Sequence, residues 1–212
     1  MIDRYLIGNA QTIGCREVQN NYFATAYNDD GDMLAVLADG AIDHRNGRMA
    51  SIVAVGSCID TFTRKFSPTG AWYTDKYFLD MAVKANRSVQ DIVYIGKNPR
   101  LSLTLVLLRD SELCYFNIGD NRIFLYDGHG ERVFGKDHNN PYAEGEFSLE
   151  PKYIIGLLSS GAYANAHPME RIKIVESKAE IFDKAQDIIE SVSRKGLTIQ
   201  INATALLIEV KR

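Results

Sequence analysis

The sequence predicts an α+β protein in which antiparallel sheets pack together with helices on the outside. Three observations support this prediction. Short apolar runs bounded by turn residues fall early in the chain and again after residue 100, where they indicate strands. Two long segments with helical periodicity follow each other between residues 45 and 95. One further helix and a closing strand end the chain, so strands and helices do not alternate as in a parallel sheet.

The first forty residues predict three strands, Tyr5–Ile13, Tyr22–Asn28 and Leu34–Gly40. The third is an apolar run that ends in Asp39 and Gly40. Glycine lets the backbone turn sharply and leaves its carbonyl accessible. Hard divalent cations bind carboxylate and carbonyl oxygens. Asp39 is therefore either a metal ligand or the N-cap of the helix that follows, where aspartate is also favoured.

Two helices are predicted next, over Arg45–Phe66 and Asp75–Ile95. In both segments, apolar residues recur at three- and four-residue spacing, so each helix has one apolar face. Thr74 is a candidate N-cap of the second helix. Ser67-Pro-Thr-Gly70 ends the first helix and Gly96-Lys-Asn-Pro99 ends the second, because proline and glycine interrupt helices.

Strands return after the helices, over Leu101–Arg109, Leu113–Ile118, Asn121–Asp127 and Glu131–Phe134. Tight turns join them, which is typical of an antiparallel meander. The segment Asp137–Pro151 is polar and irregular, so no strand or helix is predicted there.

The last part of the chain begins with a buried strand at Tyr153–Leu158. A capping box at Ser177 and Glu180 predicts the start of the final helix, which ends at Gly196. Ala203–Val210 is the closing strand.

Length and composition predict one domain spanning residues 1–212. Because 46% of the residues are hydrophobic, the chain can form a sizeable core. A net charge of −3 and a pI near 5.8 argue against nucleic acid or an anionic membrane surface as a partner. Three scattered cysteines form no CxxC pair and no zinc spacing, which fits a reduced cytoplasmic protein. We find no apolar stretch long enough to span a bilayer and no signal segment at the N-terminus.

Six short motifs follow one another along nearly the whole chain. They are Leu37-Ala-Asp-Gly-Ala-Ile-Asp-His44, Leu103-Thr-Leu-Val-Leu107, Asn117-Ile-Gly-Asp-Asn-Arg-Ile-Phe-Leu125, Gly135-Lys-Asp-His138, Leu157-Leu-Ser-Ser-Gly-Ala-Tyr163 and Ile201-Asn-Ala-Thr204. In type and order they resemble motifs of the metal-dependent protein serine/threonine phosphatases, the PPM or type 2C family. Arg16 stands where that family has its phosphate-contacting arginine. The resemblance implies a four-layer α-β-β-α sandwich of two antiparallel sheets flanked by helices.

The family hydrolyses phosphate esters with two Mn²⁺ or Mg²⁺ ions, which aspartates hold and which activate a water molecule. By resemblance, its four main aspartate positions fall at Asn21, Asp39, Gly161 and Ile201. One carboxylate in four is therefore kept, with the carbonyl of Gly40 beside it. Asp43 replaces part of the family's Gly-Gly pair and is a candidate substitute ligand.

Electrostatics decides what these losses mean. Two unit charges about 4 Å apart already interact by about 4 kcal/mol at an effective dielectric of about 20. Two divalent ions held by the single carboxylate of Asp39 should therefore not assemble. We predict a pseudophosphatase that needs no cofactor, keeps Arg16 for phosphate, and retains Asp39 and Gly40 as vestigial ligands. As a regulatory module it would bind a protein partner, such as a phosphoprotein or a kinase-pathway component.

Two alternatives remain open from the sequence. The first is an active serine/threonine phosphatase with a remodelled Mn or Mg site, which would rest on Asp39, Asp43 and Asn21. The second is a structural subunit whose apolar surface is buried in an oligomer. Candidate residues for that surface are Trp72, Tyr73 and Tyr163.

Overall fold

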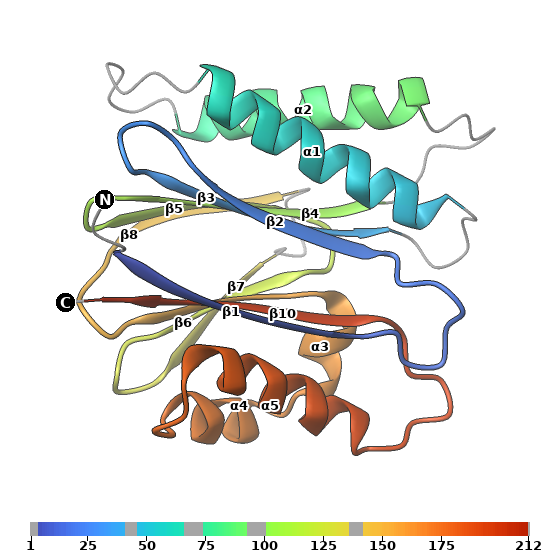
Figure 1. The fold of residues 1–212 in the computed structure, drawn as a ribbon, viewed down its shortest axis with the longest axis vertical. Coiled ribbons are helices and arrows are strands. Elements are labelled where there is room, and N and C mark those ends of the chain that lie inside the picture. The colour runs from blue at the N-terminus through green and yellow to red at the C-terminus, as the bar shows by residue number, and fades with distance from the viewer. Residues whose placement is uncertain (1–3, 41–45, 66–73, 93–100, 136–141, 212) are drawn as a thin grey trace. The chain divides into compact units, whose positions relative to one another are not determined.

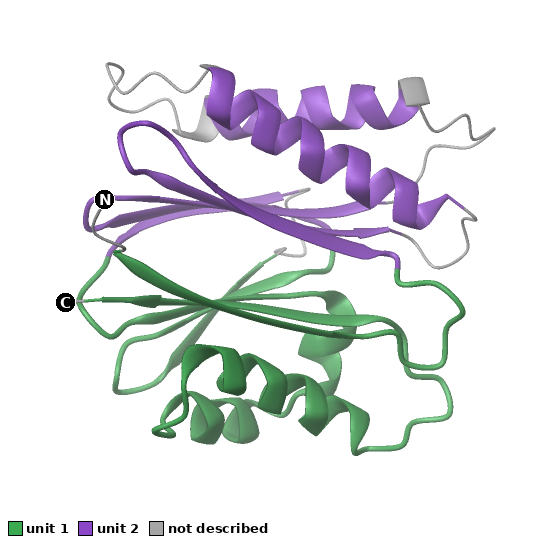
Figure 2. Cartoon of the chain, viewed as in Figure 1, with its two compact units in different colours: residues 1–19, 120–135, 149–212 green, residues 20–119, 136–148 purple. Residues whose placement is uncertain are grey.

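The chain divides into two compact units, and neither unit is continuous in sequence (Figure 2). Unit 1 contains residues 1–19, 120–135 and 149–212, and unit 2 contains residues 20–119 and 136–148. The computed structural model describes residues 4–40, 46–65, 74–92, 101–135 and 142–211. Each unit has one five-stranded antiparallel sheet with its own helices (Figure 1). The division into two compact units does not test whether residues 1–212 form one domain, so that statement stays a prediction.

The sheet of unit 2 has the strand order β2-β3-β4-β5-β8. Its strands are β2 (Asn21–Tyr27), β3 (Met33–Gly40), β4 (Leu101–Arg109), β5 (Glu112–Ile118) and β8 (Tyr142–Ser148). The apolar run of β3 is fully buried from Met33 to Ala38, as its uninterrupted hydrophobic sequence predicts. β3 therefore anchors the sheet, and Asp39 follows at its end.

Two helices, α1 (Gly47–Lys65) and α2 (Thr74–Ile92), cover one face of this sheet (Figure 1). Their apolar faces share a core with alternate residues of the strands. The rings of Phe78 and Phe116 lie 6.5 Å apart in this core. Full burial of a side chain of this size stabilises a fold by about 1.5–3 kcal/mol.

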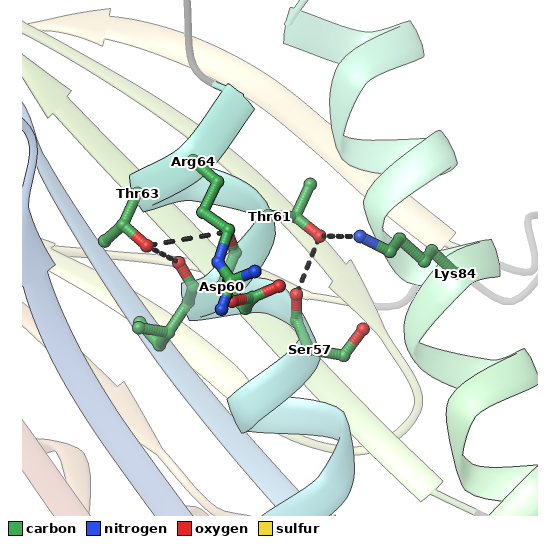
Figure 3. Close-up of polar contacts among 7 residues, drawn as sticks. Ser57, Asp60, Thr61, Thr63, Arg64 and Lys84 are labelled. Carbon is green, nitrogen blue, oxygen red and sulfur yellow. Dashed lines mark hydrogen bonds and ion pairs between the residues drawn. The ribbon is translucent and has the colours of Figure 1, made fainter.

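A polar seam joins α1 and α2 beside that core (Figure 3). The Nζ of Lys84 donates to the Oγ1 of Thr61 over 2.8 Å, and Thr61 in turn donates to the carbonyl of Ser57 over 2.7 Å. Cys58 lies next to Ser57 in the sequence and is fully buried, and this burial raises the pKa of its thiol to about 12. The helix pair is thus held by hydrogen bonds as well as by apolar contacts.

The sheet of unit 1 has the strand order β1-β10-β9-β6-β7. Its strands are β1 (Tyr5–Thr12), β6 (Arg122–Tyr126), β7 (Glu131–Gly135), β9 (Ile154–Leu158) and β10 (Ala203–Val210). β1 pairs with β10 in antiparallel register from Tyr5 opposite Val210 to Thr12 opposite Ala203. The first and last strands of the chain are therefore neighbours.

Three helices pack on one face of this sheet: α3 (Ser160–Asn165), α4 (Pro168–Val175) and α5 (Ile181–Ser193). A buried ion pair ties α4 to β7, since Arg171 Nη2 lies 2.7 Å from Glu131 Oε2 and its Nε donates to Oε1 over 2.8 Å. The guanidinium groups of Arg171 and Arg122 lie 5.0 and 5.5 Å from the ring centre of Tyr163. Tyr163 is thus half-buried within unit 1, whereas Trp72 and Tyr73 lie outside the described residues.

Four local predictions differ from the structure. The four strands after residue 100 do not form one meander, because β4 and β5 belong to the sheet of unit 2 and β6 and β7 to the sheet of unit 1. The segment predicted to be irregular contains β8, and the short helices α3 and α4 were not predicted. The capping box is wrong, because α5 has Glu180 as its N-cap residue without a side-chain hydrogen bond. The Oγ of Ser177 instead accepts from the backbone N–H of Ala179 over 3.3 Å, so it closes a turn before the helix.

Candidate functional site

The exit of β3 places three oxygen-bearing side chains in one row. Asp39 lies directly opposite Asn21 of β2 on one side and Ser102 of β4 on the other. Directly opposed residues of antiparallel strands point to the same face, with Cβ atoms about 4.5–5.5 Å apart. Because Ala38 and Leu103 belong to the core under the helices, the row lies on the sheet face that α1 and α2 do not cover. Asn21 is almost fully buried and Asp39 is partly exposed.

Gly40 follows Asp39 where the chain makes a close approach. Its backbone N–H donates to the carbonyl of Asn20 at 3.5 Å. A Cβ on Gly40 would overlap the carbonyl of Gly47, so any larger residue would displace the start of α1. Glycine is thus required by packing, independently of any metal. Asp43, the candidate substitute ligand, lies outside the described residues.

Two of the family's other aspartate positions meet in unit 1. Gly161 is the second residue of α3, and Ile201 lies just before β10. A Cβ on Gly161 would overlap the carbonyl of Asn202 and lie 2.8 Å from the Cγ1 of Ile201. The Oγ of Ser159 accepts from the N–H of Thr204 over 2.9 Å, which fixes this junction to the sheet. Neither position offers an oxygen-bearing side chain, and at Gly161 the backbone leaves no room for one.

Asn202 connects this junction to the loop that carries Arg16. Its Nδ2 donates to the carbonyls of Ile13 and Val18, over 2.9 and 3.1 Å. The N–H of Cys15 donates to the carbonyl of Gln200 over 2.9 Å. Asn202, which matches the family's closing motif, thus holds both ends of the loop around Arg16.

Arg16 is partly buried at the centre of that loop. Its Nε is buried and has no hydrogen-bond partner among the described residues. No described carboxylate forms an ion pair with it either. A guanidinium without an anionic partner is suited to bind a phosphate or carboxylate.

The sequence did not single out Ser102. Its position opposite Asp39 follows from strand register, which is set by the pairing of β3 with β4. Within the described ranges, no group of three or more His, Cys, Asp or Glu side chains is arranged to hold a metal ion. None of the described helices is both long and apolar enough to cross a membrane.

Comparison with known proteins identifies the family. The profile of the family "Protein phosphatase 2C" matches residues 17–179, which is most of the chain. The chain therefore belongs to the protein phosphatase 2C family. Protein phosphatase PhpP of Streptococcus pneumoniae is 26% identical over 211 residues, a match that covers 92% of this chain and 79% of PhpP.

Solved structures agree with this assignment at the level of the fold. The Streptococcus agalactiae serine/threonine phosphatase matches 98% of this chain and 100% of its own with a TM-score of 0.86 and 19% identity. The catalytic domain of PstP, solved with two manganese ions, matches 98% of this chain and 99% of its own with a TM-score of 0.82 and 15% identity. PppA of Pseudomonas aeruginosa, a regulatory component of a type VI secretion system, covers 97% of both chains with a TM-score of 0.74 and 17% identity. The predicted α+β phosphatase fold with two antiparallel sheets is confirmed.

Proposed function

We propose that this protein is a pseudophosphatase, a phosphatase-fold module that binds a phosphorylated protein without hydrolysing it. The observation that carries the proposal is the contact between Gly161 and the segment before β10. A side chain on Gly161 would overlap the carbonyl of Asn202, and Ile201 occupies the adjacent space. Two of the four carboxylates that a two-metal site of this family uses therefore have no substitute at their own positions.

Arg16 supplies the binding function in this proposal. It has no carboxylate partner among the described residues and sits on a loop that Asn202 fixes from both ends. Phosphate is recognised well by arginine, because the planar guanidinium offers paired donors. The partner is a phosphoprotein or a kinase-pathway component in the cytoplasm, in a bacterial-style signalling or secretion system. The regulatory role named for the P. aeruginosa relative is in keeping with this proposal.

Hydrolysis of p-nitrophenyl phosphate with excess Mn²⁺ tests the proposal, together with calorimetric titration of the metal. PhpP serves as the active control. We expect no turnover above that of Asp39→Ala and no tight binding of Mn²⁺. Asp183→Ala is the matched control, because it removes an exposed carboxylate on α5, outside the candidate site. Mn²⁺-dependent turnover that Asp39→Ala abolishes and Asp183→Ala keeps would overturn the proposal.

An active enzyme with a remodelled site is the second candidate, and one observation favours it. Asn21, Asp39 and Ser102 form a row of oxygen ligands on one sheet face, and hard cations accept carboxylate and amide oxygens. In this case one Mn²⁺ or Mg²⁺ ion would bind at the row, with Asp43 as a further ligand. Binding of a single ion that Ser102→Ala weakens, together with turnover, would favour this candidate over the binding module.

A further inference from the structure

Two loops of unit 1 are joined beside Arg16. Residues 13–18 follow β1, and residues 197–200 precede β10; the two loops lie side by side (Figure 1). Besides the bond from the Cys15 N–H to Gln200, the Sγ of Cys15 donates to the carbonyl of Leu197 over 3.5 Å. The N–H of Gln200 donates to the same carbonyl over 3.3 Å. The loops thus form one hydrogen-bonded surface.

Four aliphatic side chains of these loops are exposed. Their exposed fractions are 41% for Ile13, 47% for Val18, 40% for Leu197 and 78% for Ile199. We call these four residues the apolar platform. Single exposed aliphatic residues are ordinary, but several on two joined loops form a candidate contact surface.

The charge of Arg16 beside the apolar platform indicates which kind of ligand the platform would bind. Arg16 lies between Ile13 and Val18 in the sequence, on the same loop, and no described carboxylate pairs with it. A symmetric dimer formed over this face would bring the partner's Arg16 close to the same surface and add a second uncompensated cation. A ligand that combines aliphatic groups with a phosphate satisfies the apolar platform and the guanidinium together.

We infer that the apolar platform binds the aliphatic residues that flank the phosphorylated residue of a phosphoprotein, while Arg16 contacts the phosphate. This inference rests on the proposed function and adds a sequence preference to it. The hydrogen bonds from Asn202 and Cys15 hold the loops in place before binding. Less conformational entropy is therefore lost when a partner docks.

Four fluorescein-labelled peptides test the inference by fluorescence anisotropy. The aliphatic phosphopeptide carries valine and leucine on either side of phosphothreonine, and the polar phosphopeptide carries serine and asparagine there. An unphosphorylated copy of each completes the set, and release of inorganic phosphate is followed in the same samples. Burial of one or two aliphatic side chains predicts about tenfold tighter binding of the aliphatic phosphopeptide than of the polar one.

Ile199→Ser and the double variant Leu197→Ser with Ile199→Ser should reduce this preference to about twofold or less. Met169→Ser is the matched control, because Met169 is 68% exposed on α4 of the same unit and lies outside the apolar platform. It should keep the full preference. Because Ile199 is 78% exposed, its replacement should leave the fold intact, which thermal unfolding checks.

The outcomes separate this inference from the proposed function. Phosphate-dependent binding with equal affinity for the two phosphopeptides, or a preference that survives in Ile199→Ser, overturns the inference alone. Release of phosphate overturns the proposed function alone, and the same preference is then measured in KM. Equal binding of the phosphorylated and unphosphorylated aliphatic peptides overturns both.

Discussion

The Cγ1 of Ile201 lies 2.8 Å from the point at which a side chain on Gly161 would begin. These two positions are far apart in the sequence, and the resemblance assigns a carboxylate to each of them. Their contact therefore opposes the return of a carboxylate at Gly161. An aspartate on Gly161 would meet both Ile201 and the carbonyl of Asn202, and backbone cannot move away as a flexible side chain can.

Gly161→Ala should therefore lower the free energy of unfolding by about 1–3 kcal/mol, the usual cost of overpacking. Gly56→Ala is the matched control, since Gly56 lies within α1 and a Cβ on it would meet nothing within 4 Å. That change should raise stability by about 0.5–1 kcal/mol, because alanine favours a helix over glycine. Urea unfolding measures both variants. If Gly161→Ala were as stable as Gly56→Ala, the close contact at Gly161 would be refuted.

Removing the carboxylate of the buried ion pair in unit 1 should strongly lower the free energy of unfolding. Arg171 has an exposed side-chain fraction of 1% and Glu131 of 6%. Glu131→Ala would leave the Arg171 cation buried without its partner and should cost about 3–5 kcal/mol. Urea unfolding of Asp60→Ala provides the comparison, because its partner Arg64 is 76% exposed (Figure 3). That change should stay within about 0.5 kcal/mol. Equal losses in the two variants would contradict the assignment of Arg171 as buried.

The hydrogen bonds of Asn202 predict a local change in dynamics. Asn202→Ala removes the donor for the carbonyls of Ile13 and Val18. Each lost hydrogen bond should cost about 0.5–1.5 kcal/mol, so the loop should open more often. Hydrogen exchange followed by mass spectrometry should show faster exchange over residues 13–19. Asn165→Ala, which removes one bond to the carbonyl of Gly161, should leave exchange in that loop unchanged.

Thiol labelling should distinguish the three cysteines. Cys15 is exposed, whereas Cys58 and Cys114 are buried. Burial raises the pKa of the Cys58 thiol to about 12, so the folded protein keeps it protonated and unreactive until the pH approaches that value. Iodoacetamide at pH 8 should therefore add one group per folded chain and three in urea. Cys15→Ser should reduce the folded count to zero, and labelling of Cys58 before unfolding would contradict its burial.

Much of the fold follows from local patterns. The apolar run that forms β3, the helical periodicity of α1, α2 and α5, and the closing strand β10 were all predicted close to their observed bounds. β8 was missed because Glu144 and Glu146 alternate with a glycine in a short polar segment. Its strand conformation comes from pairing with β5, from Tyr142 opposite Ile118 to Ser148 opposite Glu112, which is a tertiary interaction.

The helices after β9 were missed for a related reason. They are short, and Pro168 stands in the first turn of α4, where its missing N–H is not needed. The candidate site shows the same limit. Local sequence predicted that Asp39 lies at the end of a strand, as it does in β3. The position of Ser102 opposite Asp39 and the contact of Gly161 with Ile201 depend instead on strand register and packing.

The pairing of β1 with β10 also has a consequence for synthesis. Gln11 donates to Thr204 across a sequence separation of 193 residues. At about 5–20 residues per second, a ribosome exposes β1 some ten to forty seconds before its partner strand exists. The strands β2 to β5 of unit 2 can pair in the meantime, because they are made in one stretch. A nascent chain thus carries an unpaired edge at β1 until β10 has emerged. Chaperones would therefore encounter β1 in this unpaired form, including on chains held by stalled ribosomes.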